Sequence, residues 1–97
     1  MSVEWMNNNV SFLDLAKLHR GEPTFQSMHG AKVIEILNLL EIVEDLGDRV
    51  MELGRSGKMP VDSATRLLAR LLECYSAPLA NSKELSQIRI ELGKANR

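Results

Sequence analysis

The first residues that suggest chemistry are four carboxylates close together at Glu41, Glu44, Asp45 and Asp48. On an α-helix, side chains three or four residues apart lie one turn apart on the same face. Helical bundles hold divalent metals with such pairs when a facing helix supplies a second pair. The rest of the chain after this run offers only isolated carboxylates, such as Glu73, Glu84 and Glu91. We therefore predict that the chain has no metal site.

Other reactive residue types also lack the neighbours that catalysis needs. The segment Gly54–Lys58 resembles a phosphate-binding loop, but the spacing of its glycines is wrong and Met59 follows the lysine. Cys74 is the only cysteine, and its place beside an apolar stripe is typical of a small buried hydrophobe. His19 stands near the predicted end of a helix, where a cation is favourable. We predict no catalytic residue, no cofactor and no enzymatic activity.

The length and composition of the chain favour one small folded domain. A chain of 97 residues has room for one hydrophobic core, and 44% hydrophobic with 26% charged residues is a globular composition. Residues 1–10 show neither helical nor strand periodicity, so we predict a flexible N-terminal arm with Trp5 as its one possible anchor. Residues 11–97 are predicted to form a single helical domain.

Periodic apolar residues and helix-ending residues predict an all-α fold, a small bundle of about four helices with one long central helix. The expected helices cover about 11–20, 31–53, from 62 or 63 to a stop at Pro78, and from Asn81 onwards. Ser11 is the expected N-cap of the first helix. Asn81, with Glu84 three residues later, resembles a capping box for the last one.

The long segment 31–53 carries an apolar heptad pattern. Its a positions are β-branched and its d positions are leucine: Ile36, Val43 and Val50, then Leu39, Leu46 and Leu53. This pattern is typical of a parallel two-stranded coiled coil, but a helix in a globular bundle shows a similar seam. We expect the globular bundle.

The first half of this segment is apolar on nearly all sides, with Glu35, Asn38 and Glu41 as a narrow polar ridge. A helix of this kind needs neighbours around most of its circumference. A second copy of the chain would supply that cover, so we predict a homodimer. The predicted self-association residues are Val33, Ile34, Ile36, Leu37, Leu40 and Val43.

The four carboxylates named first lie opposite the heptad seam and form a predicted acidic strip, Glu41, Glu44, Asp45 and Asp48. Three interpretations remain open for it. The strip binds a partner protein with a basic surface, it is a solvated face, or it pairs internally with Arg66 and Arg70. The first interpretation is the functional one, and we take it as the prediction.

The two halves of the chain differ in charge. Residues 1–53 carry nine acidic and four basic residues, whereas residues 54–97 carry four acidic and eight basic ones. We predict a non-enzymatic protein–protein interaction module, such as an adaptor, inhibitor, chaperone or regulatory cofactor. The alternative is a small nucleic-acid-binding regulator that uses the basic C-terminal helices. The sequence predicts no membrane span and no secretory signal, which leaves the cytoplasm as the expected location.

Overall fold

The structure is a computed structural model that describes residues 3–6, 9–19 and 30–95. These residues form one short 3-10 helix and four α-helices, with no strand among them. The predicted all-α bundle with one long helix is confirmed. The elements are η1 (Val3–Met6), α1 (Phe12–His19), α2 (Gly30–Arg55), α3 (Val61–Ser76) and α4 (Ser82–Ala95).

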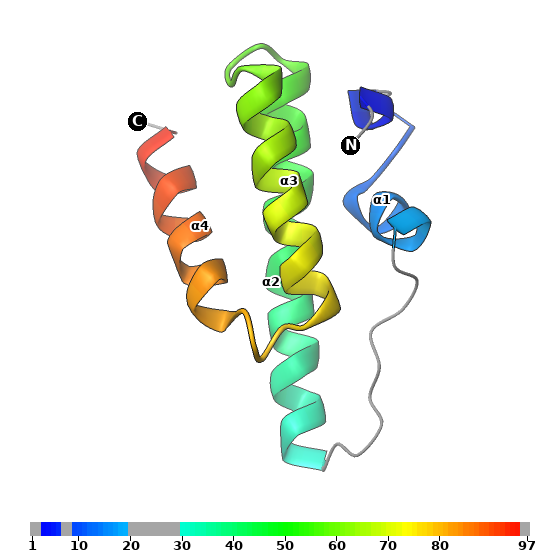
Figure 1. Ribbon diagram of the computed structural model, residues 1–97, viewed down its shortest axis with the longest axis vertical. Helices are drawn as coiled ribbons and strands as arrows, with labels where there is room; N and C mark the ends of the chain where they lie inside the picture. The colour runs from blue at the N-terminus through cyan, green and yellow to red at the C-terminus, as the bar shows by residue number, and fades with distance from the viewer. Residues whose placement is uncertain (1–2, 7–8, 20–29, 96–97) are drawn as a thin grey trace.

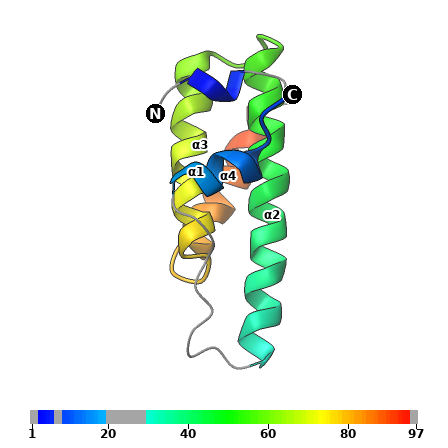
Figure 2. The same cartoon turned by 90° about the vertical axis from the view of Figure 1, so that its right-hand side faces the viewer.

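The helices are arranged around the α2–α3 pair (Figure 1). α2 and α3 run antiparallel, α4 lies on one side of them, and η1 and α1 lie on the other. Figure 2 shows α1 crossing over both central helices, with α4 behind them. The 26 residues of α2 span about 39 Å at 1.5 Å per residue, close to the 42 Å long axis of the molecule. α2 is therefore the element on which the others are assembled.

The core lies along the predicted seam of α2. The three a-position side chains, Ile36, Val43 and Val50, are at most 2% exposed, while Leu39 and Leu53 are half-buried. The stripe of α3 meets them in the same cluster, because its apolar residues recur every three or four positions. The seam is thus buried within one chain, as expected of a bundle helix.

The N-terminus of α1 is capped as predicted. The Asp14 backbone N–H donates to Ser11 Oγ at 3.2 Å, and the Ser11 N–H donates to the Asp14 carboxylate at 3.0 Å. These reciprocal bonds satisfy two donors that a helix start leaves unpaired. The bond from the Ser11 backbone N–H is the main reason that the pKa of Asp14 is lowered.

The turn between α3 and α4 differs from the prediction. The side-chain amide of Asn81 donates to the carbonyls of Ala77 at 3.0 Å and Glu73 at 3.2 Å, so it caps the end of α3. The Asn81 backbone N–H donates to Ala77 O, and Glu84 accepts a hydrogen bond from Arg70. The predicted Asn81–Glu84 capping box is therefore wrong, because both groups have other partners.

The helix boundaries are otherwise close to those expected. α2 begins one residue earlier and ends two residues later than predicted, and α3 begins at Val61, directly after Pro60. The predicted connection around residues 21–29 lies outside the described residues. No helix in the described part of the chain is long and apolar enough to cross a membrane.

Candidate interaction surfaces on α2

The outer face of α2 joins an apolar turn to an acidic one. We use this name for Ile34, Leu37, Glu41, Glu44, Asp45 and Asp48, which helical periodicity brings to the side opposite the seam. Ile34 is 63% exposed and Leu37 is 52% exposed. The carboxylates begin one turn after Leu37, and all but the half-buried Glu44 are exposed. A single helix face thus presents both aliphatic area and negative charge.

The predicted self-association residues fall into two groups. Ile36, Leu40 and Val43 are buried in the chain's own core, at 2%, 7% and 0% exposure. Ile34 and Leu37 are exposed and Val33 is half-buried. The flanking helices therefore cover more of the apolar segment than the sequence suggested. The apolar surface left for a second copy centres on Ile34 and Leu37.

Asp48 also holds the N-terminal helix in place. One of its carboxylate oxygens accepts a hydrogen bond from the Phe12 backbone N–H at 2.8 Å, at the first residue of α1. A carboxylate is favourable there because the first N–H groups of a helix lack intrahelical partners and the helix dipole is positive at that end. The acidic strip therefore contains one residue with a structural contact.

The carboxylates of the strip act on one another. Partial burial raises the pKa of Glu44, and the negative charges of Asp48, Asp45 and Glu41 raise it further. These neighbouring negative charges make the ionised form of Glu44 less stable. A cationic group that approached the strip would relieve this repulsion, so the electrostatics favour binding of positive charge.

Arg70, one of the two expected internal partners of the strip, pairs elsewhere. Its Nη1 lies 2.8 Å from Glu91 Oε2, and its Nε donates to Glu84 Oε1. Both carboxylates belong to α4, on the other side of the bundle from α1. Arg66 is exposed on α3. The predicted pairing between the acidic strip and Arg70 is therefore wrong, because Arg70 pairs with Glu84 and Glu91 of α4 instead.

A second surface of α2 receives two aromatic side chains from the N-terminal segment, the name we use for the described residues 3–6 and 9–19. A Cβ atom at Gly47 would overlap the Phe12 ring, and one at Gly54 would overlap the Trp5 ring. Phe12 and Trp5 are both fully buried. The two glycines thus act as sockets, and only the absence of side chains there lets the rings approach α2.

Polar groups hold the backbone of the same segment. The Arg55 guanidinium donates to Trp5 O from Nη2 at 2.7 Å and from Nε at 3.0 Å, and to Val10 O at 2.5 Å. Tyr75 of α3 meets the Phe12 ring edge to face, with 6.1 Å between centroids.

The Trp5 Nε1–H is buried without a hydrogen-bond partner in the structure. An unpaired buried donor of this kind costs about 1–3 kcal/mol.

Sequence reasoning identified Trp5 as a possible anchor but did not find its socket. The prediction that residues 1–10 form a flexible arm is not tested, although Trp5 within it is buried. Trp5 and Phe12 are seven residues apart, and so are Gly47 and Gly54. The sequence contains no signal for the sockets, because equal spacing in a segment that is not one helix and in α2 does not predict contact.

The remaining chemistry of the described residues is limited. No three of their His, Cys, Asp and Glu side chains are placed to hold a metal ion. Cys74 is buried, as predicted, and burial raises the pKa of its thiol to about 11. The thiol is therefore protonated at neutral pH and unreactive as a nucleophile.

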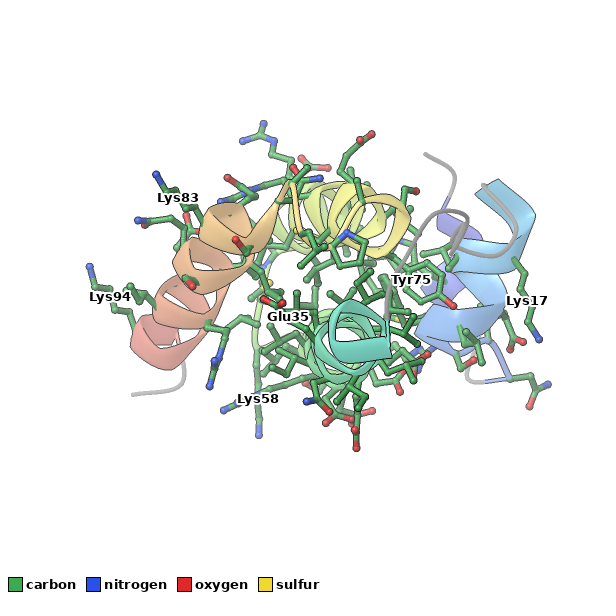
Figure 3. All side chains as sticks on the ribbon, turned by 90° about the horizontal axis from the view of Figure 1, so that it is seen from below. Lys17, Glu35, Lys58, Tyr75, Lys83 and Lys94 are labelled. Carbon is green, nitrogen blue, oxygen red and sulfur yellow. The ribbon has the colours of Figure 1, made fainter. Side chains whose placement is uncertain are left out.

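The outward side of α4 carries positive charge. Lys83 and Lys94 point away from the bundle (Figure 3). Ile90 lies between them on the same helix face and is 53% exposed.

Scans of protein-family models, curated proteins and solved structures find no protein that matches this chain.

Proposed function

We propose that this protein is a non-enzymatic interaction module that binds a basic, partly apolar segment of another protein along the outer face of α2. The observation that carries the proposal is the position of two exposed aliphatic side chains one turn ahead of the carboxylates on one helix face. Partner helices that dock on such faces bury apolar anchors at helical spacing. The complementary segment has an apolar turn next to lysine or arginine residues.

The two parts of the face have different roles in this proposal. Ile34 and Leu37 supply apolar area, which contributes about 25 cal/mol for each Å² removed from water. The carboxylates supply orientation and a faster encounter with a cationic partner, and they disfavour acidic partners by repulsion. Burial raises the pKa of Glu44 most, and the charges of Asp48, Asp45 and Glu41 raise it further; a bound cation would offset this second contribution.

The test is recovery of partners from a lysate of the native host, followed by mass spectrometry. The test variant is Glu41→Lys/Glu44→Lys/Asp45→Lys, which keeps Asp48 because its carboxylate holds Phe12. The matched control is Lys83→Glu/Lys94→Glu, which reverses charge on α4 instead. We expect the test variant to capture at least about tenfold less partner than the native protein does, because like charges across an interface cost several kcal/mol.

Circular dichroism verifies that both variants fold. If the α2 variant folds and captures the same partners as the native protein, the outer face is only a solvated surface. If the α4 control is the variant that loses its partner, the binding surface has been assigned to the wrong helix.

Self-association would use the same exposed apolar residues, Ile34 and Leu37, so a second copy and the partner segment compete for this area. We expect a homodimer, and light scattering on a size-exclusion column measures it. The test variant is Ile34→Ser/Leu37→Ser, which removes the exposed apolar area without touching the buried seam. We expect this variant to be a monomer. A monomer mass for the native protein at high micromolar concentration contradicts the homodimer and leaves these residues to a different partner.

The second candidate function is nucleic-acid binding by α4. It is favoured by one observation: Arg70 neutralises Glu84 and Glu91, while Lys83 and Lys94 point outward. Binding to phosphates weakens steeply with salt. Retardation of DNA or RNA at low salt that Lys83→Glu/Lys94→Glu abolishes would favour this function over the first.

With either function, a cytoplasmic location is part of the proposal, and the free thiol of Cys74 fits it.

A further inference from the structure

The N-terminal segment contacts the rest of the chain in the way that a bound peptide contacts its receptor. Two fully buried aromatic side chains anchor it, Trp5 at Gly54 and Phe12 at Gly47. Tyr75 of α3 adds an edge-to-face contact to the Phe12 ring. We use the name socket surface for Gly47, Gly54 and Tyr75, a different part of the α2–α3 pair from the outer face.

The two anchors occupy sockets on one side of α2. Trp5 and Phe12 are seven residues apart, and the glycines that receive them are seven residues apart in the opposite order. Seven residues of α-helix cover about 10.5 Å, which is two turns, so both sockets lie on one side of α2. The socket surface therefore receives two aromatic rings about two helical turns apart.

Charged groups at both ends of the socket surface bind the backbone of the segment. Arg55 donates to the carbonyls of Trp5 and Val10, and Asp48 accepts from the Phe12 N–H. Because these bonds go to main-chain atoms, they fix the direction and register of the segment whatever its intervening side chains are. The groups that Arg55 and Asp48 bind are all backbone atoms of the N-terminal segment.

The docked segment also carries an uncompensated group. The Trp5 side chain is 0% exposed, and its indole N–H has no acceptor among the described residues. Undocking lets water satisfy this donor, which lowers the free-energy difference between the docked and undocked states. Docking therefore costs this donor its hydrogen bonds to water, which offsets part of the gain from apolar burial.

We propose that the socket surface is a recognition site for a segment with two aromatic side chains seven residues apart, and that the N-terminal segment of a second copy of this chain occupies it in trans. The second copy is the occupant because its segment makes the same ring and backbone contacts that the structure shows in cis. Exchange of an identical element between copies is a common route to a dimer.

Docking in cis competes with docking in trans. A tethered segment acts at an effective concentration of about millimolar, so the cis state dominates in dilute native protein. The experiment must therefore remove cis docking from each of two full-length variants while keeping one competent half in each. The socket variant is Gly47→Ala/Gly54→Ala, and the segment variant is Trp5→Ala/Phe12→Ala.

Trp5 is the only tryptophan of the chain, so the segment variant has no tryptophan emission. In the socket variant alone, we expect the emission of Trp5 at long wavelength, as for an indole in water. Addition of the segment variant shifts the emission back to short wavelength and saturates at one equivalent. Light scattering then gives a mass for the mixture that is higher than that of either variant measured alone, so the added association is distinct from any dimer formed through Ile34 and Leu37.

The control is the socket variant mixed with a second sample of itself, which offers no free socket and leaves the emission unchanged. If both variants fold by circular dichroism and their mixture shows neither the shift nor the complex, the proposal is overturned. If either variant fails to fold, isotope-labelled and unlabelled native protein are mixed at millimolar concentration. Intermolecular cross-peaks between the Trp5 ring and the Gly54 Hα support the proposal, and purely intramolecular ones overturn it.

Discussion

The N-terminal segment and α4 flank the same α2–α3 pair but are attached by different means. The N-terminal segment inserts two rings into glycine sockets, and Arg55 and Asp48 bind its backbone. α4 instead lays an aliphatic stripe on the core, and Arg70 bridges it to α3 through exposed carboxylates. The first attachment depends on shape at a few points, and the second on apolar area spread along a helix.

The largest expected effect comes from removing one anchor of the N-terminal segment. Phe12→Ala lowers the free energy of unfolding by about 3–5 kcal/mol, because it removes a fully buried ring and leaves a cavity over Gly47. Urea denaturation followed by circular dichroism measures the loss. Leu13→Ala, at a half-buried neighbour, is the control with a smaller expected loss. Equal losses for the two variants contradict attachment by a discrete anchor.

The same glycine-to-alanine change is expected to have opposite effects in the two regions. Gly47→Ala improves helix propensity by about 1 kcal/mol, but its Cβ overlaps the Phe12 ring, and overpacking of this kind costs about 1–3 kcal/mol. Gly93→Ala in α4 meets nothing within 4 Å, so it stabilises the protein by about 0.5–1 kcal/mol. Thermal melts of both variants measure the two signs. A stabilising Gly47→Ala would show that the ring does not occupy this socket.

Loss of the ion pairs that hold α4 is expected to matter less. Arg70→Met keeps the aliphatic stem, and the side chains of Arg70, Glu84 and Glu91 are 35%, 39% and 49% exposed. Exposed pairs of this kind contribute at most about 1 kcal/mol. Denaturation at low and high salt measures the difference from the native protein, which decreases as salt screens the charges. A loss as large as that of Phe12→Ala would mean that α4, too, is held at one point.

The smallest expected effect is the pH dependence contributed by Glu44 on the outer face. Its pKa is raised in the folded state, first by burial and then by the neighbouring carboxylates, so the folded protein binds this proton more tightly than the unfolded chain. Its contribution to stability is therefore present below the pKa of the unfolded state and is lost as pH rises through the folded pKa. Glu44→Gln raises the melting temperature at pH 7, and the gap narrows below pH ~4. A gap that widens on acidification contradicts this sign.

The same contrast explains which parts of the molecule the sequence predicted. α4 and the seam of α2 were predicted from periodicity, because Leu85, Ile88 and Leu92 recur at the spacing that one buried face requires. The Ser11 cap of α1 was predicted because capping is local, within three residues. The sockets were missed because a glycine inside a helix reads only as a weak position until the ring above it is known.

The candidate site was predicted in outline only, for the same reason. The clustering of Glu41, Glu44 and Asp45 on one face follows from helical spacing alone. The contact of Asp48 with Phe12 joins residues 36 positions apart. Arg70 pairs with the carboxylates of α4 and not with the acidic strip of α2, and this depends on where α4 lies. No local pattern contains that information.

The rate at which the buried Cys74 thiol is labelled can measure how often the α4 side of the bundle opens. Its Sγ lies 3.8 Å from Asn81 O at the α3–α4 turn, and with a pKa of about 11 the buried thiol reacts slowly while the bundle is closed. When closing is much faster than modification, the labelling rate reports the fraction of molecules in which this region is open. Cys74 lies beside the α3–α4 turn and Trp5 lies in η1, so labelling of the first and emission from the second report separately on the release of α4 and of the N-terminal segment.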